Sequence, residues 1–281
     1  MRAWRSWWAP FATIAALLAA VYTLPPDTTM AQVRESGVLR VCVPESLPPL
    51  VTSDVAHPGI DVEILDAVAD RADLRLQLVR NRAIGRDFDP RNWRVTRAQC
   101  LVIAGGVVAT PATRAFLDTT TPHLETGWAA VAIDPDARLT GGQVGVHVPV
   151  AGLDRLALSS YLREHGATVS IVQRMDDLAL GLRAGTYDVV VTDALTAREV
   201  AADLGEDAAA MWLPSRLERF PIAFGLWKGD LTLRRAIERE LRGLEREGEI
   251  DRIVAAYELA SLSDTCWVCG DSPETSSEVP P

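Results

Sequence analysis

The chain has 281 residues, more than one hydrophobic core usually holds, so two lobes are expected. Hydrophobic residues make up 48% of it and charged residues 23%, a globular balance that excludes a disordered chain. The net charge of −10 argues against a basic nucleic-acid-binding surface. We therefore expect no nucleic-acid partner. The four histidines are scattered and form no dense run of metal ligands, so we expect no metal or other cofactor.

Residues 1–31 have the features of an export signal. Arg2 and Arg5 supply the positive start, the run Trp7–Leu24 is apolar, and Thr29–Ala31 offers small residues for a cleavage site. The apolar run is near the lower length limit of a membrane span, which favours cleavage and leaves an uncleaved signal anchor as the alternative. We therefore expect an exported, periplasmic protein.

After the leader, two consecutive units alternate strands with helices. In the first unit we expect strands at Val38–Val43, Leu74–Val79 and Cys100–Ala104 and a helix at Asp61–Asp73. In the second we expect strands at Val144–Val148, Val169–Val172 and Asp188–Thr192 and helices at Leu153–Glu164, Met175–Ala184 and Ala194–Leu204. Extended segments at Met211–Leu213 and Ile222–Trp227 and helices at Leu231–Glu245 and Ile250–Tyr257 close the chain. This alternation predicts an α/β protein with mostly parallel sheets covered by helices.

The last residues are of a different composition. From Asp264 onward the chain is rich in Ser, Pro and Glu, which predicts a frayed tail. Cys266 and Cys269 stand in this segment with C-x-x-C spacing. In an oxidising compartment this pair favours a local disulfide, and a redox centre is the alternative.

Several segments, in order, carry a resemblance to a known family. They are Gly37–Val41, Gly59–Ile64, Ala104–Pro111, Asp118–Pro122, Leu182–Asp193, and Trp227–Asp230 with Leu244–Gly248 and Tyr257. Together they resemble the family-three extracellular solute-binding proteins, which fold as type II periplasmic binding proteins. The resemblance implies a monomer with two lobes and a hinge of two crossing strands, which closes on a small ligand.

The resemblance also implies how the chain is divided. Lobe 1 would comprise residues 38–128 plus 226–262, lobe 2 residues 133–221, and a flexible tail residues 263–281. The two hinge strands would lie near Ala129–Ala132 and Ile222–Gly225.

Members that bind amino acids hold the ligand's carboxylate with an arginine three residues after the threonine of a Thr-Pro turn. Here that threonine is Thr110, the arginine's position holds Thr113, and Arg114 comes one residue later. One position is a rotation of about 100° on a helix, so Arg114 is either a displaced carboxylate ligand or a surface arginine. Val108 and the turn Pro149–Gly152 stand where the family has hydroxyl donors, so this half of the amino-acid pattern is degraded.

The family's aspartate for the ligand's ammonium group is matched by Asp193, which is alternatively the N-cap of the helix that follows it. Gly105 and Gly106 let a ligand approach the backbone. Trp128, like Trp93 and Trp212, is either a stacking surface or part of the core. The resemblance therefore predicts weak or absent binding of the standard amino acids.

A narrower resemblance concerns the segments around Cys42 and Cys100. They look like the two cysteine sites of quinoprotein-dehydrogenase-associated binding proteins, which are family-three relatives. The first and third strands are neighbours in this fold, so we expect a disulfide between these cysteines.

Three functions follow from these features. The first is a periplasmic receptor that delivers a small polar solute to the membrane subunits of an ABC importer. The second is an accessory protein for a periplasmic quinoprotein dehydrogenase. The third is a dehydratase-like enzyme, for which Glu45, Glu125 and Asp193 are candidate acids or bases without a paired arrangement. We rank them in that order and expect a binding protein rather than an enzyme.

Overall fold

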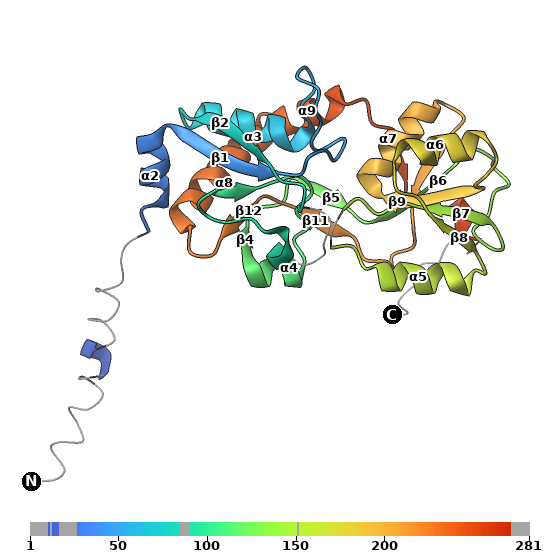
Figure 1. The fold of residues 1–281 in the computed structure, drawn as a ribbon, viewed down its shortest axis with the longest axis horizontal. Coiled ribbons are helices and arrows are strands. Elements are labelled where there is room, and N and C mark those ends of the chain that lie inside the picture. Colours follow the sequence, from blue (N-terminus) through green and yellow to red (C-terminus); the bar gives the residue numbers. More distant parts are fainter. Residues whose placement is uncertain (1–10, 12, 17–26, 85–89, 151, 271–281) are drawn as a thin grey trace, which may run out of the picture.

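The computed structural model describes residues 11, 13–16, 27–84, 90–150 and 152–270. Most of the expected export signal, Ala151 of the turn Pro149–Gly152, and residues 271–281 of the expected tail lie outside the described residues. Within the described ranges, no helix has the length and apolar character needed to cross a membrane. The chain forms two lobes, each built on its own sheet (Figure 1).

Lobe 1 is built on a mixed sheet of five strands in the order β2-β1-β3-β12-β4. The strands are β1 (Val38–Val43), β2 (Arg75–Arg80), β3 (Val102–Ile103), β4 (Leu117–Thr119) and β12 (Gly225–Trp227). The helices are α2 (Thr29–Ser36), α3 (Ile60–Arg71), α4 (Pro111–Phe116), α8 (Leu231–Arg246) and α9 (Glu249–Ala256), with a short 3-10 helix η1 at Pro90–Trp93. Strand β1 runs parallel to both of its neighbours, while β12 is antiparallel to β3 and β4.

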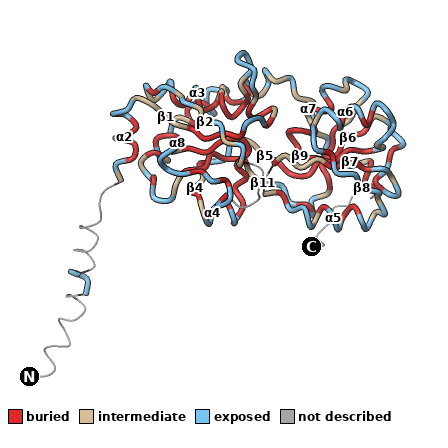
Figure 2. The backbone as a smooth tube through the Cα atoms, viewed as in Figure 1, coloured by how far each residue is buried: buried red, intermediate tan, exposed pale blue. Residues whose placement is uncertain are grey.

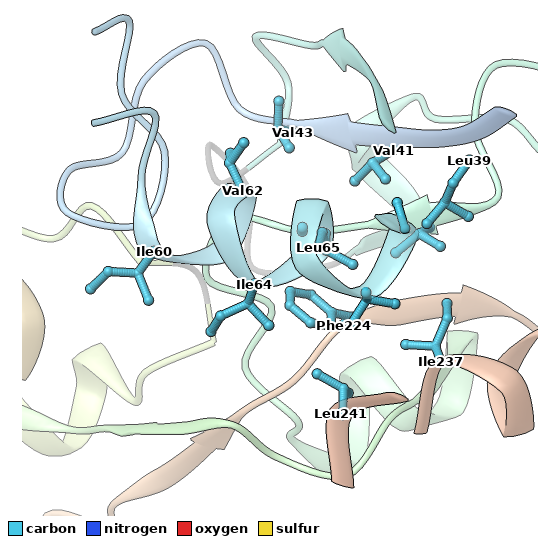
Figure 3. Close-up of a cluster of buried hydrophobic side chains, with 14 of the residues drawn as sticks. Leu39, Val41, Val43, Ile60, Val62, Ile64, Leu65, Phe224, Ile237 and Leu241 are labelled. Carbon is cyan, nitrogen blue, oxygen red and sulfur yellow. The ribbon is translucent and has the colours of Figure 1, made fainter. Parts of the chain in front are cut away.

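The main core of lobe 1 lies between this sheet and helices α3 and α8. Alternate residues of β1 face it, because successive side chains of a strand point to opposite faces. Figure 3 shows the strand, α3 and α8 converging on this core, with Leu39, Val41, Val43, Ile64, Leu65, Phe224, Ile237 and Leu241 among its side chains. Figure 2 shows that in both lobes the buried residues lie at the centre, with exposed segments at the periphery.

The opposite face of the lobe 1 sheet carries a disulfide. Cys42 of β1 and Cys100, just before β3, form this bond with their Cα atoms 5.5 Å apart, and neither residue is exposed to solvent. Their side chains lie in a second apolar cluster with Trp93 and Leu117. The disulfide expected from the neighbouring strands is confirmed.

Lobe 2 is built on a six-stranded sheet in the order β13-β10-β6-β9-β7-β8. The strands are β6 (Trp128–Ala132), β7 (Gln143–Val146), β8 (Thr168–Ile171), β9 (Val189–Asp193), β10 (Ala209–Trp212) and β13 (Leu262–Ser263). The helices are α5 (Arg155–Glu164), α6 (Asp176–Arg183) and α7 (Ala194–Leu204). Strands β7, β8 and β9 are parallel, as the alternation predicted.

The sheet of lobe 2 is covered on both faces. Val189 and Val191 of β9 pack in the cluster that contains side chains of α5, whereas Val190 between them packs in the cluster that contains α6 and α7. A strand that is buried on both faces needs an unbroken apolar run, which explains the sequence of β9.

The lobes are joined by a small antiparallel pair, β5 (Leu124–Thr126) and β11 (Phe220–Ile222). This pair forms a two-stranded sheet of its own between the two larger ones. The expected position of the first hinge strand, Ala129–Ala132, is corrected by this finding. Those residues belong to β6, which pairs on both sides within lobe 2 and is fully buried.

A third segment, Glu258–Gly270, crosses from lobe 1 to lobe 2, and we call it the C-terminal strap. Its strand β13 pairs with β10. Its 3-10 helix η2 (Trp267–Cys269) follows Cys266, and a disulfide joins Cys266 to Cys269, the last residue of that helix. Val268 is completely buried in lobe 2, and its carbonyl accepts a hydrogen bond from the N–H of Leu139 at 2.8 Å.

The strap corrects two expected boundaries. Lobe 1 does not extend to residue 262, and the described part of the tail, 263–270, is packed rather than frayed, because Val268 and Cys269 bury apolar surface that the polar composition conceals. At the other end, Thr29–Ala31 form the first turn of α2, and Met30 of that turn is buried against lobe 1. The folded part therefore begins before the expected cleavage site.

Candidate functional site

A cleft of about 620 Å³ lies between the two lobes. Its walls consist of residues that follow the carboxyl ends of parallel strands, β1 and β2 in lobe 1 and β7, β8 and β9 in lobe 2. Ligands of open α/β sheets gather at such strand ends. The lining residues are Pro44, Glu45, Ser46, Leu47, Pro48, Arg82 and Ile84 from lobe 1 and His147, Pro149, Gln173, Arg174, Met175 and Thr196 from lobe 2.

The wall from lobe 1 is held in shape by Arg80 at the end of β2. Its guanidinium donates to the carbonyl oxygen of Glu45 at 2.6 Å and to that of Thr52 at 2.8 Å, which fixes the loop after β1. Arg82 pairs with the carboxylate of Glu45 at 3.1 Å, and the two side chains are 75% and 55% exposed. Arg80 therefore positions the loop, while Arg82 and Glu45 bring charge to the cleft.

The wall from lobe 2 offers an imidazole and a guanidinium. Nδ1 of His147 lies 2.9 Å from the carbonyl oxygen of Val172. A carbonyl oxygen only accepts, so Nδ1 donates its proton in this hydrogen bond. Arg174 pairs with Asp176 at 2.9 Å, with the two side chains 72% and 64% exposed.

Beside the cleft, apolar side chains of both lobes meet in what we call the interlobe seal. It comprises Leu50 and Val108 of lobe 1 and Val150 and Leu195 of lobe 2, none of them more than 2% exposed and all in one cluster. A Cβ atom on Gly152 would lie only 3.2 Å from the Cβ of Val108, so the lobes are in direct contact here. Val108 and Val150 stand where the resemblance implied contacts to an amino acid, and an ionised group placed among them would lack a polar partner.

Arg114 lies outside the cleft. It is exposed on α4, and its backbone carbonyl accepts a hydrogen bond from Nζ of Lys228 at 2.6 Å. Thr113, at the position of the family's arginine, is buried, with its hydroxyl 3.1 Å from that of Thr110. Thr110 accepts the N–H of Thr113 and so caps α4. The offset of one residue has turned the guanidinium outward and left a neutral pair inside.

Asp193 caps helix α7. Its Oδ1 accepts the N–H groups of Leu195 at 3.1 Å and Thr196 at 3.3 Å, while its Oδ2 has no hydrogen-bond partner among the described residues. Burial raises the pKa of Asp193, whose side chain is only 1% exposed. The sequence left Asp193 as either an ammonium ligand or the N-cap of the following helix. The structure has it as the N-cap, and it is not among the residues that line the cleft.

Gly105 and Gly106 direct their amides away from the cleft. Both donate to Oδ2 of Asp61, at 2.8 and 3.2 Å, and Oδ1 of the same carboxylate lies 2.8 Å from Nε2 of His123. Asp61 is completely buried. These glycines, which are in the left-handed region with φ of 88° and 76°, therefore complete a buried hydrogen-bond network.

Trp128 is a core residue. It is 2% exposed, and its Nε1 donates to the carbonyl oxygen of Asp154 at 3.1 Å. Trp93 and Trp212 are also buried, at 3% and 9%. None of the three lines the cleft. In the described ranges, no group of three or more His, Cys, Asp or Glu side chains is placed to hold a metal ion.

Two arginines and a histidine that line the cleft with Glu45 were not singled out from the sequence. Arg82, His147 and Arg174 each stand one to three residues beyond the end of a strand, at Arg80, Val146 and Ile171. These residues could have been found from the sequence by their position just after a parallel strand, because residues in that position share one edge of the sheet.

Glu199 of α7 is a half-buried carboxyl group that lines a second hollow together with Met175 and Asp176. Burial, together with the neighbouring carboxylates of Asp193, Asp176 and Asp203, raises its pKa from the ordinary 4.5 to about 7. Between these pH values the folded chain keeps a proton that the unfolded chain has lost. The contribution of Glu199 to stability therefore falls as the pH rises through that window.

We expect the substitution Glu199→Gln to stabilise the protein at pH 8 by about 1–3 kcal/mol relative to the natural chain and to have little effect at pH 4.5. Urea denaturation at both pH values measures the difference. Glu206→Gln, at an exposed position near the end of the same helix, is the matched control and is expected to show no such pH dependence. An equal effect of Glu199→Gln at both pH values contradicts the prediction.

Solved structures of similar fold are solute-binding proteins. The ancestral cationic amino acid solute-binding protein AncCDT-1 is 16% identical, with a TM-score of 0.65, 82% of this chain covered and 99% of that chain. A mutant of ArgBP from T. maritima is 24% identical, with a TM-score of 0.61 and coverages of 82% and 98%. The substrate-binding protein of an ABC uptake transporter from Streptococcus pneumoniae, solved with bound histidine, is 16% identical, with a TM-score of 0.62 and coverages of 82% and 96%. No curated protein matches the chain by sequence.

These similarities show the two-lobed periplasmic binding protein fold. The family model for bacterial extracellular solute-binding proteins, family 3, matches residues 39–260, which span both lobes and the hinge between them. The chain therefore belongs to family 3 of the bacterial extracellular solute-binding proteins.

Proposed function

We propose that the protein is a periplasmic receptor that captures a small polar solute, other than a standard α-amino acid, for delivery to an ABC importer. The observation that carries this proposal is the cleft of about 620 Å³ whose polar walls come from both lobes. A solute that contacts both walls favours the closed arrangement of the lobes, and a hinge of two strands allows that closure.

The interlobe seal is the reason for setting the standard amino acids aside. A free α-amino acid brings a carboxylate and an ammonium group that both need partners when they are removed from water. The side chains of Val108 and Val150 offer none, Arg114 is exposed outside the cleft, and Asp193 is not among the residues that line it. The solute is therefore expected in the cleft, outside the seal.

We expect a thermal-shift screen of small polar solutes to find one that stabilises the protein, while none of the twenty amino acids does. A solute at 100 times its dissociation constant adds about 2.7 kcal/mol to the free energy of unfolding. The substitution Ser46→Trp fills the cleft and should abolish the shift, whereas Ser215→Trp, at an exposed position outside the cleft lining, should keep it. Micromolar binding of any amino acid, lost in Arg114→Ala, contradicts the proposal.

The second candidate is an accessory protein for a periplasmic quinoprotein dehydrogenase. It is favoured by the interlobe seal, whose apolar side chains stand where the family has ligand contacts, and by the disulfide Cys42–Cys100. In that case the dehydrogenase would bind the protein directly and no solute in the screen would stabilise it. No feature of the cleft favours a dehydratase, because its one lining carboxylate, Glu45, is exposed and ion-paired with Arg82.

A further inference from the structure

We propose that the exposed face of helix α8 is a docking surface for an anionic phospholipid bilayer, which holds lobe 1 against the membrane. We call this face the arginine stripe, and it comprises Arg235, Arg239, Arg242 and Arg246. The inference goes beyond the capture of a solute, because none of these residues lines the cleft.

The stripe results from the spacing of the arginines along α8. They follow one another at intervals of four, three and four residues, and a helix turns by about 100° per residue, so they lie within an arc of about 60°. The opposite face of the helix packs in the core of lobe 1, through Leu233, Ala236, Ile237, Leu241 and Leu244. The four exposed guanidinium groups therefore share one side of the helix, along about 16 Å of its length.

This side of α8 carries little negative charge. Only two residues of the helix outside the stripe are exposed, Leu231 and Glu245. Glu245 lies about 90° around the helix from the middle of the stripe. Because the whole chain has a formal net charge of −10, a basic face of this kind orients the molecule toward an anionic surface that repels the rest of it.

Most of the stripe is also free of ion pairs. Arg239 pairs with Glu240 at 2.7 Å. The other three arginines form no ion pair in the part of the chain that the structure describes. Glu247, the carboxylate near Arg246, is itself held by Arg71. The stripe therefore keeps guanidinium groups that are available to an external anion.

A short N-terminal segment is fixed to the start of the same helix. The hydroxyl of Thr29 donates to Oδ1 of Asp230, the residue before α8, at 3.1 Å. The N–H of Met30 donates to the hydroxyl of Thr232 at 3.2 Å, and the N–H of Thr232 donates to Oδ2 of Asp27 at 2.6 Å. These contacts make the segment part of folded lobe 1, which favours an uncleaved signal anchor over cleavage at the expected site.

The apolar run before this segment brings α8 close to a membrane. Trp7–Leu24 ends three residues before Asp27, and three residues of chain span at most about 11 Å. With the run as a membrane anchor, the start of α8 is held near the bilayer surface. Contacts with lipid headgroups then form within one tethered assembly, so weak contacts suffice to keep the stripe on the membrane.

An anionic bilayer suits the stripe because it offers many phosphate groups in one plane. A guanidinium donates two N–H groups to the oxygens of a phosphate, and a row of four can contact several headgroups at once. Four or more basic residues on an amphipathic helix, or next to a membrane-inserted segment, are typical of surfaces that bind anionic lipids. The stripe has both features.

The test is chemical modification of the full chain reconstituted in vesicles of phosphatidylcholine, alone or mixed equally with phosphatidylglycerol. Phenylglyoxal modifies accessible guanidinium groups, and mass spectrometry gives the rate at each arginine. Both vesicles hold the same anchor, so a difference between them reports the stripe. We expect the stripe to be modified roughly five-fold more slowly in the mixed vesicles at low salt, and this protection to disappear at high salt. Arg163, exposed on α5 of lobe 2, should react equally in both.

A double variant tests whether the stripe acts as one surface. Arg235→Gln together with Arg242→Gln removes two of its four charges, so Arg239 and Arg246 should lose most of their protection in the mixed vesicles. The matched control is Arg163→Gln together with Arg183→Gln, which removes the same charge from exposed positions of lobe 2 and should leave the stripe protected.

Three results would overturn the proposal. Equal modification of the stripe in both kinds of vesicle would leave it for an acidic protein partner instead of lipid. Protection of Arg163 to the same degree as the stripe would show that α8 is not the docking face. Protection that persists in the double variant of the stripe would come from another part of lobe 1.

Discussion

Replacement of Asp61 by alanine is expected to lower the free energy of unfolding by about 3–5 kcal/mol. The carboxylate is completely buried and satisfies the N–H groups of Gly105 and Gly106 together with the ring of His123. Its removal leaves two backbone donors and an imidazole buried without a partner, and each such group costs about 1–3 kcal/mol.

Urea denaturation measures this loss. Asp70→Ala, which changes an exposed aspartate of the same helix α3, is the matched control and is expected to cost less than about 1 kcal/mol. Asp61→Asn keeps an acceptor but adds donors where donors already converge, so an intermediate loss is expected. A loss below about 1 kcal/mol for Asp61→Ala would show that the network contributes little to stability.

The second large effect is expected from the disulfide between Cys42 and Cys100. The bond closes a loop across a sequence separation of 58 residues, and its removal by a double substitution to serine should cost about 4 kcal/mol. The reason is that the unfolded chain regains conformational freedom that the bond had removed. The measurement is urea denaturation of the double variant and of the natural chain without reductant.

The disulfide between Cys266 and Cys269 provides the internal comparison. It spans a separation of only three residues, so the same substitutions there should cost roughly 2 kcal/mol. A reductant breaks both bonds, so it should bring the natural chain close to a variant in which all four cysteines are replaced by serine. An equal loss for the two pairs would contradict the loop-length explanation.

The fold could be predicted because local patterns and tertiary structure agree over most of the chain. The limits of α7 were predicted to the residue, since Asp193 caps its start and Gly205 follows its end. The tail was misjudged for the opposite reason. Its composition is polar, and only the packing of Val268 and Cys269 against lobe 2, a contact between distant parts of the chain, orders it.

The site could be predicted only in part. The loss of the amino-acid ligands was visible from Val108 and Val150, which cannot donate hydrogen bonds. That these two valines lie in one apolar cluster shared by both lobes depends on how the lobes are placed, which the periodicity of the sequence does not show. The same is true of Arg82 and Arg174, which are 92 positions apart and become neighbours of one cleft only after both sheets have formed.

The C-terminal strap has a consequence for the order in which the protein acquires its structure. Lobe 1 takes strand β12 and helices α8 and α9 from the last quarter of the chain, and lobe 2 takes β13 and Val268 from its very end. Neither sheet can be completed while the chain is still emerging, whether from a ribosome or from an export channel, because each waits for residues that arrive last. The order of the elements along the chain therefore makes completion of both sheets a late event in folding.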